Sequence, residues 1–261
     1  MQQYIRALRS LPLTPRSLPF REHSTANMAP PQLPGFKLEW SDDFLGAKYT
    51  QPYSTNWDIR ADNPLWDQQE VQLYTKSAEN VCLSGSPEGS MLIIPVREIN
   101  PDPAQFTMPD PKNPFWTSGR VEGNLTWNCN PKQKLIFQAR IRTPGWDATK
   151  QKGIWPAFWT LGDFFKTTGR GDWPRCGEWD IMEKRGSWKT TVGSLHSGNQ
   201  WNATVSAGGG TPGQPATTGP ISDPGQYNTF AIQVDCTKPG EEQFTWIING
   251  IPLPNPVTTL L

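Results

Sequence analysis

Apolar and polar residues alternate with a period of two from Phe36 onward. The clearest runs are FKLEW (36–40), KLIFQARIRT (134–143), FAIQVD (230–235) and FTWIIN (244–249). Alternation of this kind is typical of half-buried β-strands, because successive side chains point to opposite faces of a sheet. Asn249-Gly250 follows the last run and predicts a type I′ turn with another strand after it. No segment has the 3.6-residue period of an amphipathic helix.

Short predicted strands separated by Gly, Pro and Asn turns indicate an all-β fold. We expect a β-jelly-roll sandwich of two antiparallel sheets over residues 34–261, with the Gly-rich stretch 206–220 as a surface loop. The chain ends NGIPLPNPVTTLL, which leaves no visible partner for the strand expected after the turn. Because a sandwich needs protected sheet edges, we expect the last strands of the domain to be missing, and the domain to be C-terminally incomplete.

Residues 1–33 differ from the rest of the chain. They carry four arginines before the first acidic residue, and they lack the continuous apolar segment of a secretory signal. They also include most of the segment MAPPQLP, which offers little to pack in a core. We therefore expect a disordered leader over 1–33, and we interpret the start site as wrongly assigned.

Composition excludes some classes of partner. The chain of 261 residues has 24 basic and 24 acidic residues, which gives no reason to expect nucleic acid or an anionic membrane as partner. No run of 18 apolar residues predicts a membrane span. The 13 tryptophans are numerous, and their flat apolar faces with a polar edge suit ligands such as sugars.

Cysteines and glycosylation sequons favour export. The chain has four cysteines, none in a Cys-x-x-Cys pair: Cys82, Cys129, Cys176 and Cys236. Four cysteines allow three disulfide pairings, and the sequence alone does not choose among them. Sequons at Asn124 and Asn202 would accept glycans in a secreted protein. We expect a secreted or cell-wall glycoprotein.

Three acidic residues stand close together in CGEWDIMEKRG (176–186). In a regular strand Glu178 and Asp180 would share a face, and Met182 rather than Glu183 would be the third residue on it. A β-bulge, which inserts one extra residue after Asp180, would bring Glu183 onto the face of the other two acids. We therefore predict a bulge between Asp180 and Glu183.

The predicted bulge suits glycoside hydrolysis. It would bring the carboxyl groups of Glu178 and Glu183 to roughly 5–6 Å from each other, near the ~5–5.5 Å of retaining glycosidases. One glutamate would attack the anomeric carbon while the other holds a proton for the leaving oxygen, and Asp180 would tune this division. The residues alone leave two alternatives open, which are a solvated acidic face and a hard-metal site built from carboxylates.

Aromatic residues surround the acids in the sequence. The segments GIWPAFWTLG (153–162) and GDWPRCGEWD (171–180) contain Trp155, Trp159 and Trp173. Strand alternation divides these three tryptophans between the acid-bearing face and the core. His196 lies one predicted strand later, and we expect it to reach the same cleft.

These motifs together resemble glycoside hydrolase family 16 in its laminarinase-like form, which has the bulged E-x-D-x-x-E signature. The matching segments, in family order, are LEWSDDF, EVQLYT, SGRVEG, QARIRTP, GIWPAFWTLG, GEWDIMEKRG, SLHSG and FAIQVD. The resemblance covers residues 36–252. It implies a concanavalin A-like jelly roll that hydrolyses internal bonds of β-1,3- or mixed β-1,3/1,4-glucans with retention. By motif position, Glu178 would be the nucleophile, Asp180 the assisting acid and Glu183 the general acid/base.

The resemblance also implies residues that contact the sugar. Trp155, Trp173 and His196 match positions that line the subsites next to the cleaved bond, and Arg120 and Glu70 match positions that commonly face the cleft. The family usually has Ile or Leu where this chain has Trp179. That residue would point into the core between the sheets and need a matching space there.

Several expectations about activity and partners follow from the resemblance. The partner would be a β-glucan polysaccharide or oligosaccharide, and we expect a monomer. The family's structural calcium draws on a closing strand that this chain lacks, so we expect no metal and no cofactor. Two other functions stay open, which are a cell-wall glucan transglycosylase on the same fold and a non-catalytic β-glucan-binding module.

Overall fold

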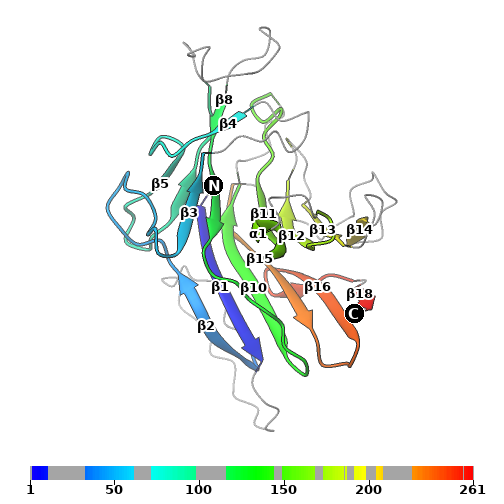
Figure 1. Ribbon diagram of the computed structural model, residues 1–261. Coiled ribbons are helices and arrows are strands. Elements are labelled where there is room, and N and C mark those ends of the chain that lie inside the picture. Colours follow the sequence, from blue (N-terminus) through cyan, green and yellow to red (C-terminus); the bar gives the residue numbers. More distant parts are fainter. Residues whose placement is uncertain are drawn as a thin grey trace. The chain divides into compact units, whose positions relative to one another are not determined.

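The computed structural model describes residues 2–10, 33–61, 72–97, 116–143, 149–167, 173–184, 186, 191–197, 204–207, 225–254 and 256–260. The chain divides into two compact units. One consists of Met1–Gln3 and Asp43–Thr126, and the other of Tyr4–Asp42 and Trp127–Leu261. The described part is almost entirely β-structure, as the alternating pattern predicts (Figure 1).

In its described residues, the first unit has seven short strands. They are β3 (Trp57–Arg60), β4 (Gln72–Tyr74), β5 (Val81–Leu83), β6 (Met91–Ile93), β7 (Val96–Arg97), β8 (Trp116–Ser118) and β9 (Arg120–Gly123). Antiparallel pairs join β3 with β9, β5 with β6 and β7 with β8, while β4 and β8 run parallel. Buried Val81, Cys82 and Met91 belong to its core, and Phe44 packs on Trp57 with ring centroids 5.4 Å apart.

The larger sheet of the second unit is built from seven strands in the part of the chain that the structure describes. They are β1 (Gln2–Ser10), β2 (Phe36–Asp42), β10 (Lys134–Arg142), β15 (Asn228–Asp235), β16 (Glu241–Ile248), β17 (Ile251–Pro252) and β18 (Val257–Leu260). Their order is β17-β16-β15-β10-β1, with β2 paired to β1 and β18 paired to β16. The first two residues of β1 belong to the first unit, where they pair with β6.

The smaller sheet of the second unit carries the predicted acidic strand. It consists of β11 (Ala157–Leu161), β12 (Glu178–Glu183), β13 (Val192–His196) and β14 (Thr204–Ala207), all antiparallel and in this order. A single-turn helix, α1 (Phe164–Thr167), follows β11. No helix in the described part of the chain is long and apolar enough to cross a membrane.

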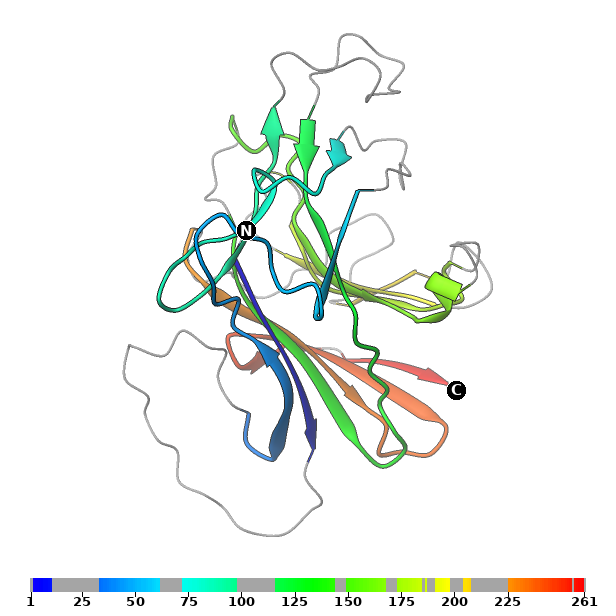
Figure 2. The same ribbon diagram turned by 60° about the vertical axis from the view of Figure 1, so that its left-hand side comes forward.

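The two sheets of the second unit pack face to face, as Figure 2 shows for β11–β13 over β10, β15 and β16. Trp179 of β12 crosses the space between them. Its ring lies 5.2 Å from that of Phe244 and 6.4 Å from that of Phe137, both in the larger sheet. The prediction that Trp179 points into the core is therefore confirmed, as is the predicted two-sheet sandwich.

The prediction of a disordered leader over residues 1–33 is wrong for Gln2–Ser10, which form β1. Ala7 and Leu8 are fully buried, and Leu8 packs with Ile136, Ala231 and Ile247. The physical reason is that β1 lies between β2 and β10 in one sheet, so paired strands flank it on both edges and its central residues join the core of that sheet. Residues 11–32 lie outside the described residues.

The expectation that the chain ends without a partner strand is also wrong. Asn249 and Gly250 both have positive φ, 51° and 80°, and turn β16 into β17 as the type I′ signal predicts. The chain then returns as β18, in which Val257 lies opposite Phe244 on the edge strand β16. β17 and β18 both pair with β16 through backbone hydrogen bonds, so they protect the edge of the sheet that β16 would otherwise expose.

Candidate active site

The predicted bulge is present in β12. Against β11, Met182 lies opposite Phe158 and Asp180 lies opposite Trp159, so Ile181 is the extra residue. The pairing with β13 is shifted at the same place, between Asp180 and Glu183. The one-residue mismatch in the acidic motif is therefore the sequence signature of this bulge, and the prediction is confirmed.

The bulge places all three acids on one face of the sheet. On β11 the residues opposite Glu178, Asp180 and Glu183 are, in turn, Leu161, Trp159 and Ala157. On β13 they are His196, Ser194 and Val192. Each of these neighbouring sets follows an i, i+2, i+4 series, and directly opposed residues of an antiparallel pair share a face. Both neighbouring strands therefore assign the three carboxyl groups to the same side.

A buried tryptophan of the opposite sheet holds the bulge. Trp246 of β16 is 3 % exposed, and its indole N–H donates to the backbone carbonyl of Asp180 at 2.8 Å. Gly193 of β13 makes room for this contact, since a Cβ atom there would overlap the Trp246 indole. Sequence patterning places Trp246 in the core, but nothing in the sequence links it to Asp180, so this role was not predicted.

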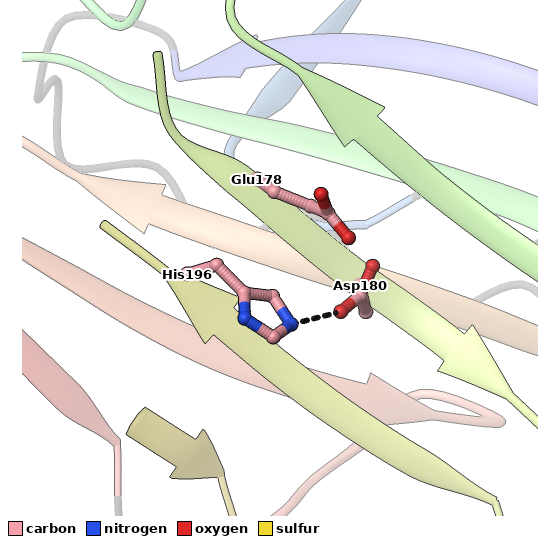
Figure 3. A group of neighbouring side chains, drawn as sticks. All are labelled: Glu178, Asp180 and His196. Carbon is pink, nitrogen blue, oxygen red and sulfur yellow. Dashed lines mark hydrogen bonds and ion pairs between the residues drawn. The ribbon is translucent and has the colours of Figure 1, made fainter. Parts of the chain in front are cut away.

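Each acidic side chain accepts a hydrogen bond from, or shares one with, a side chain named in the sequence analysis. The Trp173 indole donates to Glu178 Oε2 at 2.6 Å, and the Trp155 indole donates to Glu183 Oε1 at 2.8 Å. His196 Nε2 lies 3.0 Å from Asp180 Oδ2. Figure 3 shows His196 on β13 reaching across to Asp180 on β12, beside Glu178.

The carboxyl groups of Glu178 and Asp180 lie close enough to influence each other's ionisation. Burial raises the pKa of Glu178 from 4.5 to about 8, and the neighbouring negative charge of Asp180 adds to this rise. His196 and the Trp173 hydrogen bond act in the opposite direction. The hydrogen bond between the two carboxyl groups also raises the pKa of Glu178.

The prediction that alternation divides the three tryptophans between the acid-bearing face and the core is wrong. Trp159 lies opposite Asp180 on β11 and so shares the face of the acids. Trp155 precedes β11, and Trp173 precedes β12, so neither obeys strand alternation. Both reach the acids from loops instead, which is why a period of two does not apply to them.

The sequence analysis did not predict the role of Lys184, a buried lysine that directly follows the acidic motif. It is 1 % exposed, and its ammonium donates to the Gly186 carbonyl at 2.9 Å and to Gln151 Oε1 at 3.3 Å. Burial lowers its pKa. Its backbone N–H also binds the Pro156 carbonyl, so Lys184 ties down the segment that carries Trp155. A lysine beside an acidic motif looks like a solvated surface residue, so no signal in the sequence reveals this.

Two predicted sugar-contacting residues, Arg120 and Glu70, stay predictions. Arg120 lies in the first unit, where its guanidinium donates to Glu122 Oε1 at 2.7 and 3.0 Å. Glu70 lies outside the described residues. A role of either residue in the cleft stays a prediction.

The site has donor atoms that could approach a metal ion. The ligand atoms of Glu178, Asp180 and His196 all lie within 4.8 Å of one another, but they are engaged in the hydrogen bonds described above. Calcium takes six to eight oxygen ligands. A group of two carboxylates and one imidazole supplies fewer oxygens than that, so these three residues alone do not fit calcium.

The fold and the site resemble those of laminarinase-like β-sandwich proteins, and comparisons with known proteins agree. A glucan endo-1,3-β-glucosidase A1 of Niallia circulans is 28 % identical over 190 residues, which is 69 % of this chain and 24 % of that protein. A β-glucanase of Rhodothermus marinus is 31 % identical over 168 residues, covering 63 % and 49 % of the two chains. The chain thus spans half or less of the length of these curated relatives. No protein-family model matches it.

Solved structures give the same result for the fold. The crystal structure of endo-1,3-β-glucanase from Streptomyces sioyaensis superposes with a TM-score of 0.69 and 27 % identity, and the match covers 88 % of this chain and 79 % of that one. The laminarinase catalytic domain of Thermotoga petrophila matches with a TM-score of 0.53 and 22 % identity, over 85 % and 76 % of the two chains. The resemblance to laminarinase-like proteins of glycoside hydrolase family 16 is therefore confirmed.

Proposed function

We propose that the protein hydrolyses internal bonds of β-1,3- or mixed β-1,3/1,4-glucans with retention of the anomeric configuration. The observation that carries this proposal is the bulge in β12, which brings Glu178, Asp180 and Glu183 onto one face. A solvated acidic face would not need a bulge held by a buried indole, whereas a two-carboxylate mechanism depends on such alignment. The names of the relatives supply the substrate class.

In this mechanism Glu178 attacks the anomeric carbon and forms a glycosyl ester, while Glu183 gives its proton to the leaving oxygen. Glu183 then removes a proton from water, which attacks the same carbon and releases Glu178. Glu178 must be ionised when it attacks. The hydrogen bond that the Trp173 indole donates to Glu178 favours this ionised form, and so does the nearby His196, because both lower the pKa of Glu178.

The sugar would bind over the acid-bearing face beside the exposed ring of Trp155 and the half-buried ring of Trp173. Aromatic faces suit the apolar faces of pyranose rings. Their indole N–H groups are already used by the glutamates, so these tryptophans would contact substrate and orient the acids at the same time. We also propose secretion or cell-wall location, a monomer, and glycosylation at the two sequons.

The test is laminarin turnover by the wild-type chain and by Glu178→Gln. The wild type should release reducing ends with the β-configuration first, as NMR of fresh product would record. Glu178→Gln should lose turnover by a factor on the order of 10³ or more while it still binds laminarin, because the amide keeps the shape but cannot attack. Lengthened oligosaccharides from the wild type would instead indicate a transglycosylase.

A non-catalytic β-glucan-binding module is the second candidate. A protein of Mycobacterium tuberculosis with the same fold, at 21 % identity and a TM-score of 0.53, is described as a pseudo β-1,3-glucanase. The fold alone therefore does not establish turnover. Wild-type protein that binds laminarin but releases no reducing ends would favour the binding module and refute the hydrolase.

A further inference from the structure

Two of the four cysteines meet at one end of the β10–β15 pair. Lys134 opposite Asp235 is the last pair of this ladder. Beyond it the Cys236 N–H donates to the Gln133 carbonyl at 2.9 Å, and the Lys132 N–H donates to the Cys236 carbonyl at 2.8 Å. Cys236 is therefore fixed at its backbone, directly beyond the end of two central strands.

Cys129 is folded back onto the same place. The Gln133 N–H bonds to the Asn130 carbonyl at 3.1 Å, which closes a turn immediately after Cys129. The Cys129 thiol lies 3.4 Å from the Gln133 carbonyl and 3.5 Å from that of Val234. The Gln133 carbonyl is the one that also binds the Cys236 N–H, and the two thiols are hydrogen-bonded to each other.

We propose that Cys129 and Cys236 form a disulfide bond when the protein meets an oxidising environment, and that this bond fastens the Trp127–Gln133 segment to the end of β15. The sequence leaves three pairings open, and the geometry selects the one that includes Cys129–Cys236. All four cysteines are thiols in the structure. Cys82 is buried in the other unit, and Cys176 precedes β12.

The reaction balances with glutathione disulfide as the oxidant. The Cys129 thiolate attacks one sulfur of glutathione disulfide and releases one glutathione thiolate, which takes up a proton. The Cys236 thiolate then attacks the Cys129 sulfur and releases the second glutathione. The two protein thiols lose two electrons and two protons, and glutathione disulfide is reduced to two glutathione molecules.

The surroundings favour attack by Cys129 first. It is half-buried, whereas Cys236 is buried. Burial raises the pKa of both thiols, but the hydrogen bond between them lowers that of Cys129 and raises that of Cys236. Glu242 Oε1 lies 3.9 Å from Cys236 Sγ and can accept the second proton. Burial raises the pKa of this carboxyl, which makes it a better base.

A disulfide here would stabilise the second unit strongly. Cys129 and Cys236 are about 100 residues apart. A disulfide that closes so long a loop lowers the conformational entropy of the unfolded chain more than one that closes a short loop. We expect the Tm of the oxidised protein to exceed that of the reduced protein by roughly 10 °C, from the loop length and the usual scaling of Tm with stability. The proposal does not depend on glucan hydrolysis.

The test compares the full chain with itself in two redox states. The protein is equilibrated with glutathione disulfide or with a phosphine reductant, blocked with iodoacetamide, digested without reduction and analysed by mass spectrometry. A peptide linked through Cys129 and Cys236 should dominate the oxidised sample, and only the oxidised sample should have the higher Tm. Because the wild type serves as its own reference, no variant has to fold for the test to work.

Two serine variants give the control. Cys129→Ser should lose the difference in Tm between the two buffers, while Cys176→Ser, which removes another half-buried cysteine, should keep it. The proposal is overturned if Cys129 and Cys236 both remain alkylated in glutathione disulfide. It is equally overturned if either is linked mainly to a different cysteine.

Discussion

Trp246→Phe removes one N–H donor from the core of the second unit. The lost hydrogen bond joins the indole to the Asp180 carbonyl at 2.8 Å, where β12 enters its bulge. The phenyl ring fills most of the same space, so the change acts mainly on this contact. The variant therefore asks whether the bulge, and with it the position of Glu183, depends on a donor from the opposite sheet.

The size of the effect follows from the burial of Trp246. A buried carbonyl left without a partner costs about 1–3 kcal/mol. In a domain of this size each kcal/mol lowers Tm by roughly 2–4 °C. If the bulge relaxes, the Glu183 carboxyl moves relative to Glu178, and a displacement of about 1 Å can cost on the order of 10²-fold in rate. We expect kcat to fall by roughly 10–100-fold with little change in KM, because the tryptophans that contact sugar are untouched.

The assay is kcat and KM on laminarin together with Tm by calorimetry, and the matched control is Phe244→Leu. Phe244 lies on the same strand and packs on Trp179 in the same core. Its shortening should lower Tm by a similar amount and leave kcat within about twofold. Gly193→Ala perturbs the contact from the other side, since its methyl group would overlap the indole. It should reproduce the loss of kcat.

Equal kcat values in Trp246→Phe and Phe244→Leu, at matched loss of Tm, would refute the reasoning. In that case the bulge would hold its shape through its strand pairing alone, and the indole would contribute only to packing. A large rise in KM without a fall in kcat would also contradict it, because the change would then act on sugar binding.

Three further predictions follow from the same site. Trp173→Phe removes a hydrogen bond that lowers the pKa of Glu178, so the acid limb of the kcat/KM–pH profile should move to higher pH. At acid pH, kcat/KM should fall about tenfold. The control is Trp155→Phe, which removes the indole that binds Glu183 and should leave the acid limb in place. Since the pKa of Glu178 in the folded protein is about 8 rather than 4.5, its ionisation destabilises the fold, and the wild type loses stability as pH rises between these values. Glu178→Gln should therefore raise Tm by roughly 5 °C at pH 8 and change it little at pH 4, and equal Tm gains at both pH values would contradict this. Gly162→Ala would drive a methyl group into the Cys176 carbonyl and should cost roughly 1–3 kcal/mol in urea unfolding with an unchanged m-value.

In the second unit, the sequence correctly predicts strands and turns whose structure depends only on residues close together in the chain. Alternation identifies β10, β15 and β16, and Asn249-Gly250 predicts the β16–β17 turn. The bulge is predictable because the E-x-D-x-x-E spacing conflicts with a period of two. These features depend on the residues of one strand or one turn, which is why patterning finds them.

Features that depend on two distant segments are not predictable in this way. β1 looks like part of a polar leader, because its burial comes from neighbouring strands far along the chain. Trp246 and Lys184 look like ordinary core and surface residues, and their partners are fixed only when the sheets pack. Trp155 and Trp173 reach the acids from loops, where no periodic rule applies.

The geometry of the proposed active site depends on both sheets of the second unit. The carboxyl groups lie on one sheet, but the backbone carbonyl at the bulge is bound by an indole of the other sheet. The spacing of the two glutamates is therefore set by core packing as well as by the motif itself. Substitutions at Trp246 or Gly193 should alter turnover without touching the sugar, whereas substitutions in the loops of Trp155 and Trp173 should alter turnover and binding together. If kcat falls only in proportion to the loss of Tm in every core variant, the core does not set the position of the glutamates, and the reasoning is wrong.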